Sequence, residues 1–90
     1  MGNMFIKMKL MPNSPDEDLE ALKTHSKKVL EKNHMKNITF HEEPIAFGLK
    51  AVIASFAMDE SHELEASEKA LAKIEGVSSV QVIDMRRDFM

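Results

Sequence analysis

The stretch ITFHEEPIAFGLK, residues 38–50, lies in the middle of the chain and joins two apolar runs through a short loop. Pro44 fixes one backbone torsion and lacks an N–H donor, whereas Gly48 permits torsions that other residues avoid. The two residues therefore bracket a tight connection. Apolar and polar residues alternate before the loop, and residues 49–58 are apolar at nearly every position, so the sequence predicts two neighbouring strands with Phe47 at the tip between them.

The N-terminal third has the pattern of a strand followed by a helix. Residues 4–10 alternate apolar and basic side chains, the two-residue period of a strand that has one face on a core. The quartet SPDE at 14–17 then predicts a helix start, with Ser14 as N-cap and Glu17 closing a capping box. We expect this helix to end near residue 33, after which a polar connection leads to the central strands.

The C-terminal third repeats helix and strand. Asp59-Glu60-Ser61 ends the central apolar run and is expected to cap a second helix, and Gly76 is expected to end that helix. Alternating residues from 77 to 85 predict a last strand. Residues 86–90 then form a short tail.

The expected order is strand, helix, strand, strand, helix, strand. Connections of these lengths suit right-handed crossovers onto one antiparallel sheet. We therefore predict an α+β fold of the ferredoxin-like, split βαβ class, in which a four-stranded antiparallel sheet carries two helices on one face. A chain of 90 residues supports one core, so residues 1–90 are expected to form a single domain.

Composition excludes several classes of function. The chain has no cysteine, which excludes disulfides, thiolate metal sites and a cysteine nucleophile. No apolar run approaches the length of a membrane span, and the N-terminal residues lack the pattern of a secretion signal. We therefore expect a cytoplasmic protein with no membrane partner. The net charge of −3 argues against nucleic acid as a direct partner.

The sequence shows no pattern of metal ligands and no nucleotide-binding loop. Its four histidines stand at positions 25, 34, 41 and 62, without the paired spacing of a zinc site. Its three glycines are isolated, so it has no glycine-rich loop that could hold a phosphate. We expect no metal, no cofactor and no independent nucleotide binding.

Two other functions are compatible with this fold. An RNA-recognition module shares the strand order and needs exposed aromatic residues on the central strands, for which Phe5 and Phe56 are the only candidates. The basic and aromatic motif of that module is missing from the third strand. A small-molecule regulatory domain is the other alternative. Phe47 itself has two interpretations, an exposed anchor for a partner or a side chain tucked beneath the nearest helix.

Two segments together resemble a known family. MPNSPDEDL at 11–19 and EPIAFGLK at 43–50 look like segments of the catalytic, guanine nucleotide exchange domain of translation elongation factor 1-beta, and the similarity spans essentially the whole chain. The loop is its most specific part, because it resembles the family pattern Pro-hydrophobic-Gly-aromatic-Gly-hydrophobic-Lys, with Ala46 replacing a glycine. The absence of an N-terminal extension resembles the short archaeal form.

The resemblance implies a ferredoxin-like fold and an exchange factor without covalent chemistry. Its partner would be elongation factor 1-alpha, the GTPase that carries aminoacyl-tRNA and on which the family exchanges GDP for GTP. Alignment on the loop also implies that Phe56 points inward. The implied contact residues in the loop are Pro44, Ile45, Ala46, Phe47, Gly48 and Lys50.

The C-terminus departs from the family pattern. In family members a lysine at the extreme C-terminus is implicated at the Mg²⁺ site of the GTPase, whereas this chain ends Met85-Arg86-Arg87-Asp88-Phe89-Met90. We expect Arg86 or Arg87 either to do a related job or to be an ordinary solvated strand end.

Overall fold

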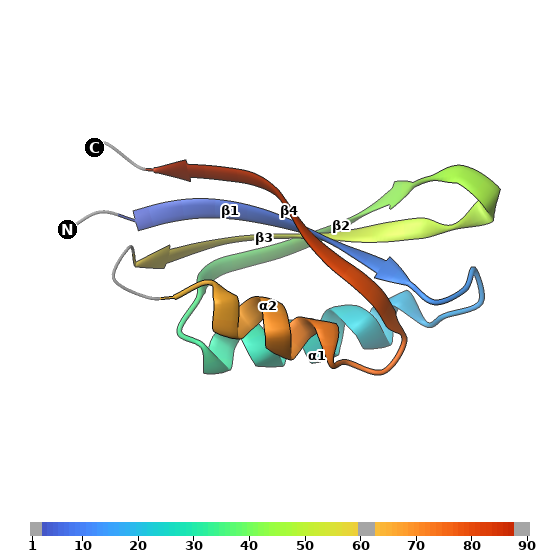
Figure 1. Cartoon of the computed structure of the whole chain (residues 1–90), viewed down its shortest axis with the longest axis horizontal. Helices are drawn as coiled ribbons and strands as arrows, with labels where there is room; N and C mark the ends of the chain where they lie inside the picture. The colour runs from blue at the N-terminus through green and yellow to red at the C-terminus, as the bar shows by residue number, and fades with distance from the viewer. Residues whose placement is uncertain (1–2, 60–62, 88–90) are drawn as a thin grey trace.

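The computed structural model describes residues 3–59 and 63–87. The chain follows the order expected from the sequence and forms an elongated molecule of 42 × 22 × 17 Å (Figure 1). The elements are β1 (Asn3–Pro12), α1 (Leu19–Lys32), β2 (Lys36–Pro44), the short 3₁₀ turn η1 (Ala46–Gly48), β3 (Lys50–Asp59), α2 (Glu65–Ala72) and β4 (Val77–Arg87).

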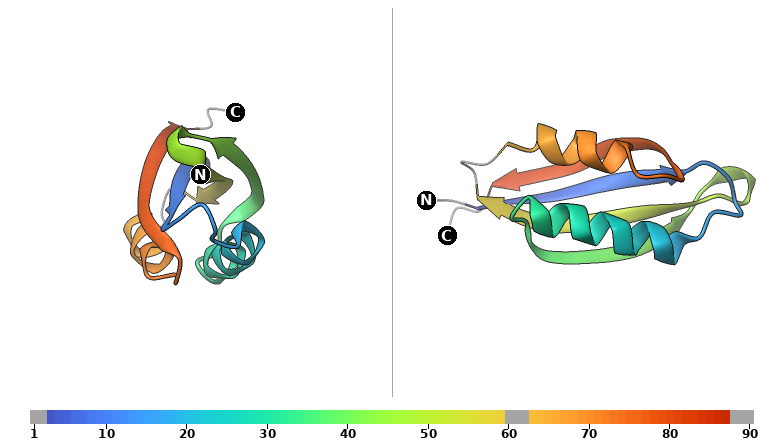
Figure 2. Two further views of the ribbon diagram at one scale, coloured as in Figure 1. Left: turned by 90° about the vertical axis from the view of Figure 1, so that its right-hand side faces the viewer. Right: turned by 90° about the horizontal axis from the view of Figure 1, so that it is seen from below.

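The strands form one antiparallel sheet in the order β2-β3-β1-β4. Both helices lie on the same face of this sheet, and the opposite face carries no helix (Figure 2). The start of β1 and the end of β4 lie together at one end of the molecule, since Met4 pairs with Arg87. The predicted α+β, ferredoxin-like split βαβ fold is confirmed.

Alternate residues of the central strands form the core between the sheet and the helices. Burial of each large apolar side chain contributes about 1.5–3 kcal/mol to stability. Phe56 is 3% exposed and belongs to this core, so it points inward as expected and is not available on the open face. The buried cluster consists of Ile6, Met8, Leu10, Leu22, Leu30, Met35, Val52, Ala54, Phe56, Met58, Leu71 and Val77.

Helix α1 begins later than the sequence predicted. Its N-cap is Asp18, whose carboxylate accepts hydrogen bonds from the backbone N–H groups of Glu20 at 3.1 Å and Ala21 at 3.2 Å. Ser14 instead belongs to a turn in which its carbonyl accepts a 3.3 Å hydrogen bond from the N–H of Glu17. The predicted Ser14 cap and Glu17 capping box were therefore wrong.

Backbone contacts at both ends of α1 explain its limits. The N–H of Asn13 donates a 2.9 Å hydrogen bond to the carbonyl of Gly76, which holds the connection after β1 against the one before β4. At the other end the helix stops at Lys32, close to the predicted end, with Asn33 as its C-cap, and His34 follows in the left-handed conformation at φ 66°.

The start of α2 also differs from the prediction. Strand β3 continues through Asp59, which pairs with Asn3 of β1, so Asp59 does not cap the helix. Glu60 and Ser61, the other residues of the predicted cap, lie outside the described residues. The helix begins at Glu65 with Leu64 as its N-cap and has no side-chain capping hydrogen bond.

The last strand begins and ends where pairing with β1 allows it. Helix α2 ends at Ala72, and Gly76, at φ 96°, turns the chain into β4 instead of ending the helix. Arg86 and Arg87 were expected in a tail, but they belong to β4 because Phe5 and Met4 of β1 supply strand partners for them.

Candidate functional site

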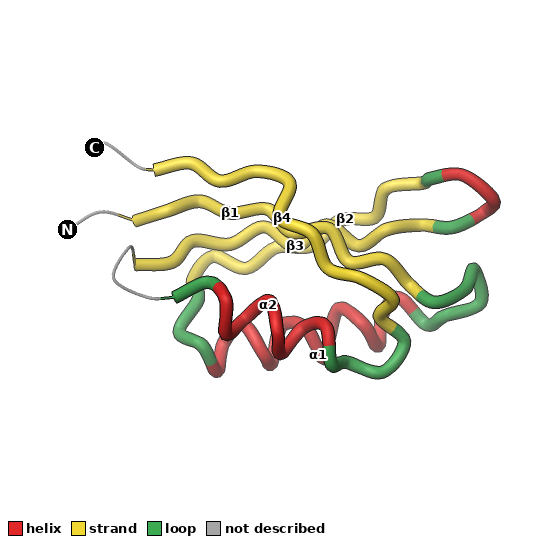
Figure 3. Tube along the Cα trace, viewed as in Figure 1, coloured by secondary structure: helices red, strands yellow, loops and turns green. Residues whose placement is uncertain are grey.

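The hairpin of β2 and β3 projects past the ends of both helices (Figures 1 and 2). Pro44 and Lys50 are its last paired residues, and beyond them the N–H of Ile45 donates a 2.8 Å hydrogen bond to the carbonyl of Leu49. A further hydrogen bond of 3.3 Å joins the N–H of Leu49 to the carbonyl of Ala46. The tip is therefore a closed turn, drawn as the short helical segment at the end of the hairpin in Figure 3.

Phe47 and Gly48 occupy the two central positions of this turn, and both have left-handed torsions. Phe47 has φ 64° and ψ 28°, and Gly48 has φ 76°. Positive φ at both central residues is the requirement of the tight hairpin turn whose twist matches the flanking strands. Glycine meets it without strain, whereas a side chain in this region costs about 1–2 kcal/mol.

Burial of the Phe47 ring does not offset this strain. It is 93% exposed, against 3% for Phe56 in the core. Of the two interpretations open from the sequence, the exposed side chain is therefore the one found. Strained torsions and exposed aromatic rings together are typical of a surface built to contact another molecule.

A salt bridge joins the hairpin to the helix layer. The ammonium of Lys23 in α1 donates a 2.8 Å hydrogen bond to the carboxylate of Glu42 in β2, and lies 3.3 Å from Glu20. The hydrogen bond and charge of Lys23 hold the pKa of Glu42 below its ordinary value of 4.5. The hydrogen bond to Glu42 is likewise the largest cause that raises the pKa of Lys23 above 10.5.

Arg86 and Arg87 lie at the opposite end of the sheet from the loop. Arg86 pairs with Phe5, which pairs in turn with Ala57 of β3. Between Lys50 and Ala57 the strand rises by about 23 Å at about 3.3 Å per residue. The fold therefore does not bring the arginines to the loop, and the two parts of the expected site lie at opposite ends of the molecule.

The two arginines also differ in direction. Neighbouring residues of a strand point to opposite faces, and Arg86 shares the face of its partner Phe5, whereas Arg87 shares the face of Met4. Arg86 is therefore on the helix-free face, where its Nε lies 3.2 Å from a carboxylate oxygen of Asp84. Strand alternation therefore directs the two side chains to opposite faces at the end of β4.

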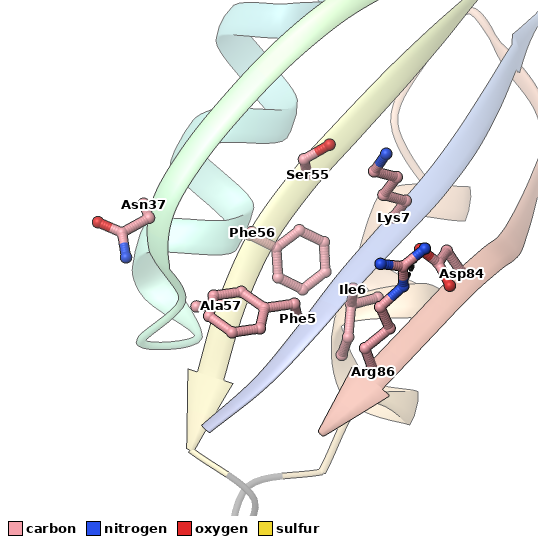
Figure 4. A pocket seen from close by; sticks show the side chains of 9 residues that line it. All are labelled: Phe5, Ile6, Lys7, Asn37, Ser55, Phe56, Ala57, Asp84 and Arg86. Carbon is pink, nitrogen blue, oxygen red and sulfur yellow. Dashed lines mark ion pairs between the residues drawn. The ribbon is translucent and has the colours of Figure 1, made fainter. Parts of the chain in front are cut away.

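A hollow of about 440 Å³ lies beside Arg86 on the sheet (Figure 4). Phe5 and Lys7 of β1 border it together with Arg86 and Asp84 of β4, and Asn37 borders it from β2. The sequence predicted none of this, because the hollow needs residues of all four strands to meet in one register. The one available signal was that Phe5 alternates with the core residues of β1, which places its ring on the face away from the core.

Two further observations concern absences within residues 3–59 and 63–87. No group of three or more histidine, cysteine, aspartate or glutamate side chains there could hold a metal ion. In the same part of the chain, no helix is long and apolar enough to cross a membrane.

Comparison with known proteins decides the family. The family model of the EF-1 guanine nucleotide exchange domain matches residues 5–87. The protein named elongation factor 1-beta from Methanosarcina mazei is 43% identical over 88 residues, which cover 97% of this chain and 99% of that protein. Those so named from Methanosarcina barkeri and Methanothermobacter thermautotrophicus are each 44% identical over 97% of this chain, and the matches cover 99% and 98% of those proteins.

The chain belongs to the EF-1 guanine nucleotide exchange family. The resemblance noted in the sequence is confirmed, and with it the function of guanine nucleotide exchange in translation elongation. The relatives named above are archaeal proteins of nearly the same length, as expected for the short form.

The exchange-domain loop tolerates its one departure from the family pattern. In the described part of the chain the non-glycine residues with positive φ are His34, Asn37 and Phe47, and Ala46 is not among them. The conformational freedom of a glycine is therefore not needed at position 46. At Gly48 it is needed, because of the torsion rather than space, since a Cβ added there would have no atom within 4 Å.

Proposed function

We propose that the protein speeds GDP release from elongation factor 1-alpha in the cytoplasm by inserting Phe47 into an apolar pocket of that GTPase. The observation that carries this proposal is the 93% exposed ring at the tip of a closed, projecting hairpin. Large aromatic side chains that enter a pocket dominate the energy of many interfaces. Because the turn is already formed, docking would order little of the backbone.

The proposed mechanism is a linkage between two binding events. A factor that binds the nucleotide-free GTPase more tightly than the loaded one must weaken nucleotide binding by the same ratio. No covalent bond is made or broken. The exchange factor therefore needs no catalytic residue, no cofactor and no nucleotide site of its own, and it would act without contacting nucleic acid directly.

The remaining residues of the loop would position the Phe47 ring and contact the GTPase around it. Pro44 and Lys50 form the last strand pair below the turn, and Gly48 supplies the second left-handed torsion. Ile45 is half-buried beneath the tip, whereas Ala46 and Lys50 are exposed beside it. We propose that residues 44–48 and Lys50 form one contact surface, with Phe47 at its centre.

One ring is not sufficient for a large acceleration. Speeding GDP release about a thousandfold, at a constant rate of rebinding, requires about 4 kcal/mol. Burial of one phenylalanine supplies about 1.5–3 kcal/mol. We therefore propose a second contact with the same GTPase at the end of β4, through Arg86 and Arg87.

Replacement of Phe47 by alanine tests the proposal. We expect Phe47→Ala to slow the release of a fluorescent GDP analogue from elongation factor 1-alpha by about 10- to 100-fold, with the thermal midpoint unchanged. Ile83→Ala is the matched control, because Ile83 is also an exposed apolar residue, at 45%, and lies on β4 away from the loop. Equal release rates for the two variants would contradict the proposal.

A further inference from the structure

The hollow on the helix-free face of the sheet has a clear structural cause. Two small residues of the central strand β3, Ser55 and Ala57, lie on this face between much larger neighbours. At the edge, β2 carries a register shift between Lys36 and Thr39, where Asn37 has a φ of 53°. Such bulges re-aim side chains and are frequent beside binding sites.

The groups around the hollow combine an apolar surface with positive charge. The ring of Phe5 is 46% exposed, although β1 is a central strand. Lys7 lies on the same face, two residues further along β1, and Arg86 lies opposite Phe5 on β4. Figure 4 shows the guanidinium of Arg86 beside Asp84, which engages its Nε and leaves the terminal nitrogens of the guanidinium as donors.

We propose that this hollow receives an acidic segment of the GTPase that also carries an apolar side chain. The apolar side chain would lie against Phe5, and a carboxylate would accept hydrogen bonds from Lys7 and Arg86. The inference rests on the proposed exchange function. It locates the second contact that is needed because burial of Phe47 alone does not supply enough binding free energy. About 23 Å of strand separates the two contacts, so the factor would hold its partner at two distant points.

Charge and aromatic content favour a protein segment over a nucleic acid. A single strand needs successive aromatic platforms and several phosphate contacts. Phe5 is the only aromatic residue on this face of the described sheet, since Phe40 and Phe56 pack with the core. Asp84, which lies opposite Lys7 on β4 and forms an ion pair with Arg86, offsets one of the two positive charges.

Binding to the nucleotide-free GTPase tests this proposal independently of the loop. We expect Phe5→Thr to weaken the complex about tenfold, and Lys7→Gln to weaken it about threefold with a smaller dependence on salt. Thr keeps a high strand propensity, so both variants should remain folded, and a thermal melt of each checks this. The matched controls are Ile83→Thr, for an apolar residue of equal exposure, and Lys9→Gln, for the next lysine on the same strand face.

The outcomes separate this inference from the exchange mechanism. If Phe47→Ala slows exchange while the Phe5 and Lys7 variants bind like their controls, the loop mechanism stands and the hollow proposal is overturned. If the Phe5 and Lys7 variants bind weakly while Phe47→Ala exchanges normally, the hollow proposal stands and the loop mechanism falls. Binding of a labelled single-stranded RNA that Phe5→Thr abolishes, without loss of GTPase binding, would instead assign the hollow to nucleic acid.

Discussion

Lys23 and Glu42 join the helix layer to the hairpin through a 2.8 Å hydrogen bond. Glu42 lies two residues before Pro44, the last residue of β2. Both side chains are partly shielded, with 22% of Lys23 and 34% of Glu42 exposed. The salt bridge is therefore placed to restrain the hairpin that carries Phe47 relative to α1.

The bridge predicts a pH dependence of stability. Because the folded state lowers the pKa of Glu42, its stabilising contribution is complete above pH 4.5 and is lost as pH falls through the folded pKa. The raised pKa of Lys23 keeps the lysine charged up to at least pH 10.5. We expect the thermal midpoint of Glu42→Gln to lie below that of wild type by a constant amount between about pH 6 and 9, and the gap to close in acid.

Glu43→Gln is the control for this titration, since Glu43 lies on the opposite face of β2. Thermal melts of wild type, Glu42→Gln and Glu43→Gln from pH 3 to pH 9 would compare their midpoints. An unchanged gap at pH 3 would show that the bridge does not contribute to stability.

Substitution of Phe47 should raise the stability of the protein and lower its exchange activity. Phe47→Gly removes the strain of a side chain at φ 64°, and we expect it to stabilise the protein by about 0.5–1 kcal/mol. It should slow nucleotide exchange at least as much as Phe47→Ala. Denaturant unfolding and exchange kinetics on the same samples would measure both effects, and a loss of stability would show that the turn is not strained.

The two described left-handed glycines should respond differently to substitution. Gly48 has open space around it, so Gly48→Ala should cost only the torsional penalty, about 1 kcal/mol. A Cβ on Gly76 would lie 2.8 Å from Glu17 Oε2 and 3.3 Å from Leu22 Cδ2. The Glu17 carboxylate can move aside, but Leu22 is buried, so Gly76→Ala should cost more than Gly48→Ala, about 2 kcal/mol, and urea unfolding would rank the two.

Two helix serines should be replaceable with a gain in stability. Within the described part of the chain the hydroxyls of Ser26 and Ser67 are buried and have no hydrogen-bond partner. We expect Ser26→Ala and Ser67→Ala each to stabilise by about 0.5–1 kcal/mol, since a buried unpaired hydroxyl is removed and alanine favours helix. Thr24→Ala is the comparison, because the exposed Thr24 hydroxyl donates a 2.9 Å hydrogen bond to the carbonyl of Glu20.

The two arginines of β4 should have separable effects. Arg86 borders the hollow, so Arg86→Ala should weaken docking equally at low and high Mg²⁺. Arg87 points to the other face, and we expect Arg87→Ala to slow exchange more at high Mg²⁺ than at low if it acts near the nucleotide. Release of fluorescent GDP at two Mg²⁺ concentrations would distinguish them, and identical profiles would mean that both arginines only assist docking.

Periodicity and turn chemistry were sufficient to predict the sheet and the loop. The alternation through Ile6 and Met8 identified the core face of β1, and the Pro44 and Gly48 pair located the hairpin. Helix starts were less predictable, because Ser14 and Asp18 are both good caps. Nothing local separates them, and the structure uses Asp18, whose carboxylate accepts hydrogen bonds from the N–H groups of Glu20 and Ala21.

The geometry of the candidate site was predicted in part. The sequence placed Phe47 at the tip of a short loop but left open whether its ring is exposed or tucked beneath a helix, and the structure shows it exposed. The separation of the loop from Arg86 depends on strand direction and length, and the hollow at Phe5 depends on the register of four strands. Neither property has a local signal in the sequence.

Register shifts interrupt both outer strands of the sheet, at residues 36–39 of β2 and beside Ile83 of β4. An unbroken outer strand would offer a ladder of free amide and carbonyl groups to any similar chain. The irregularities leave no such flat ladder at these points of the two edges. The bend at Asn37, which borders the hollow, thus also makes this part of β2 less suited to pair with another strand.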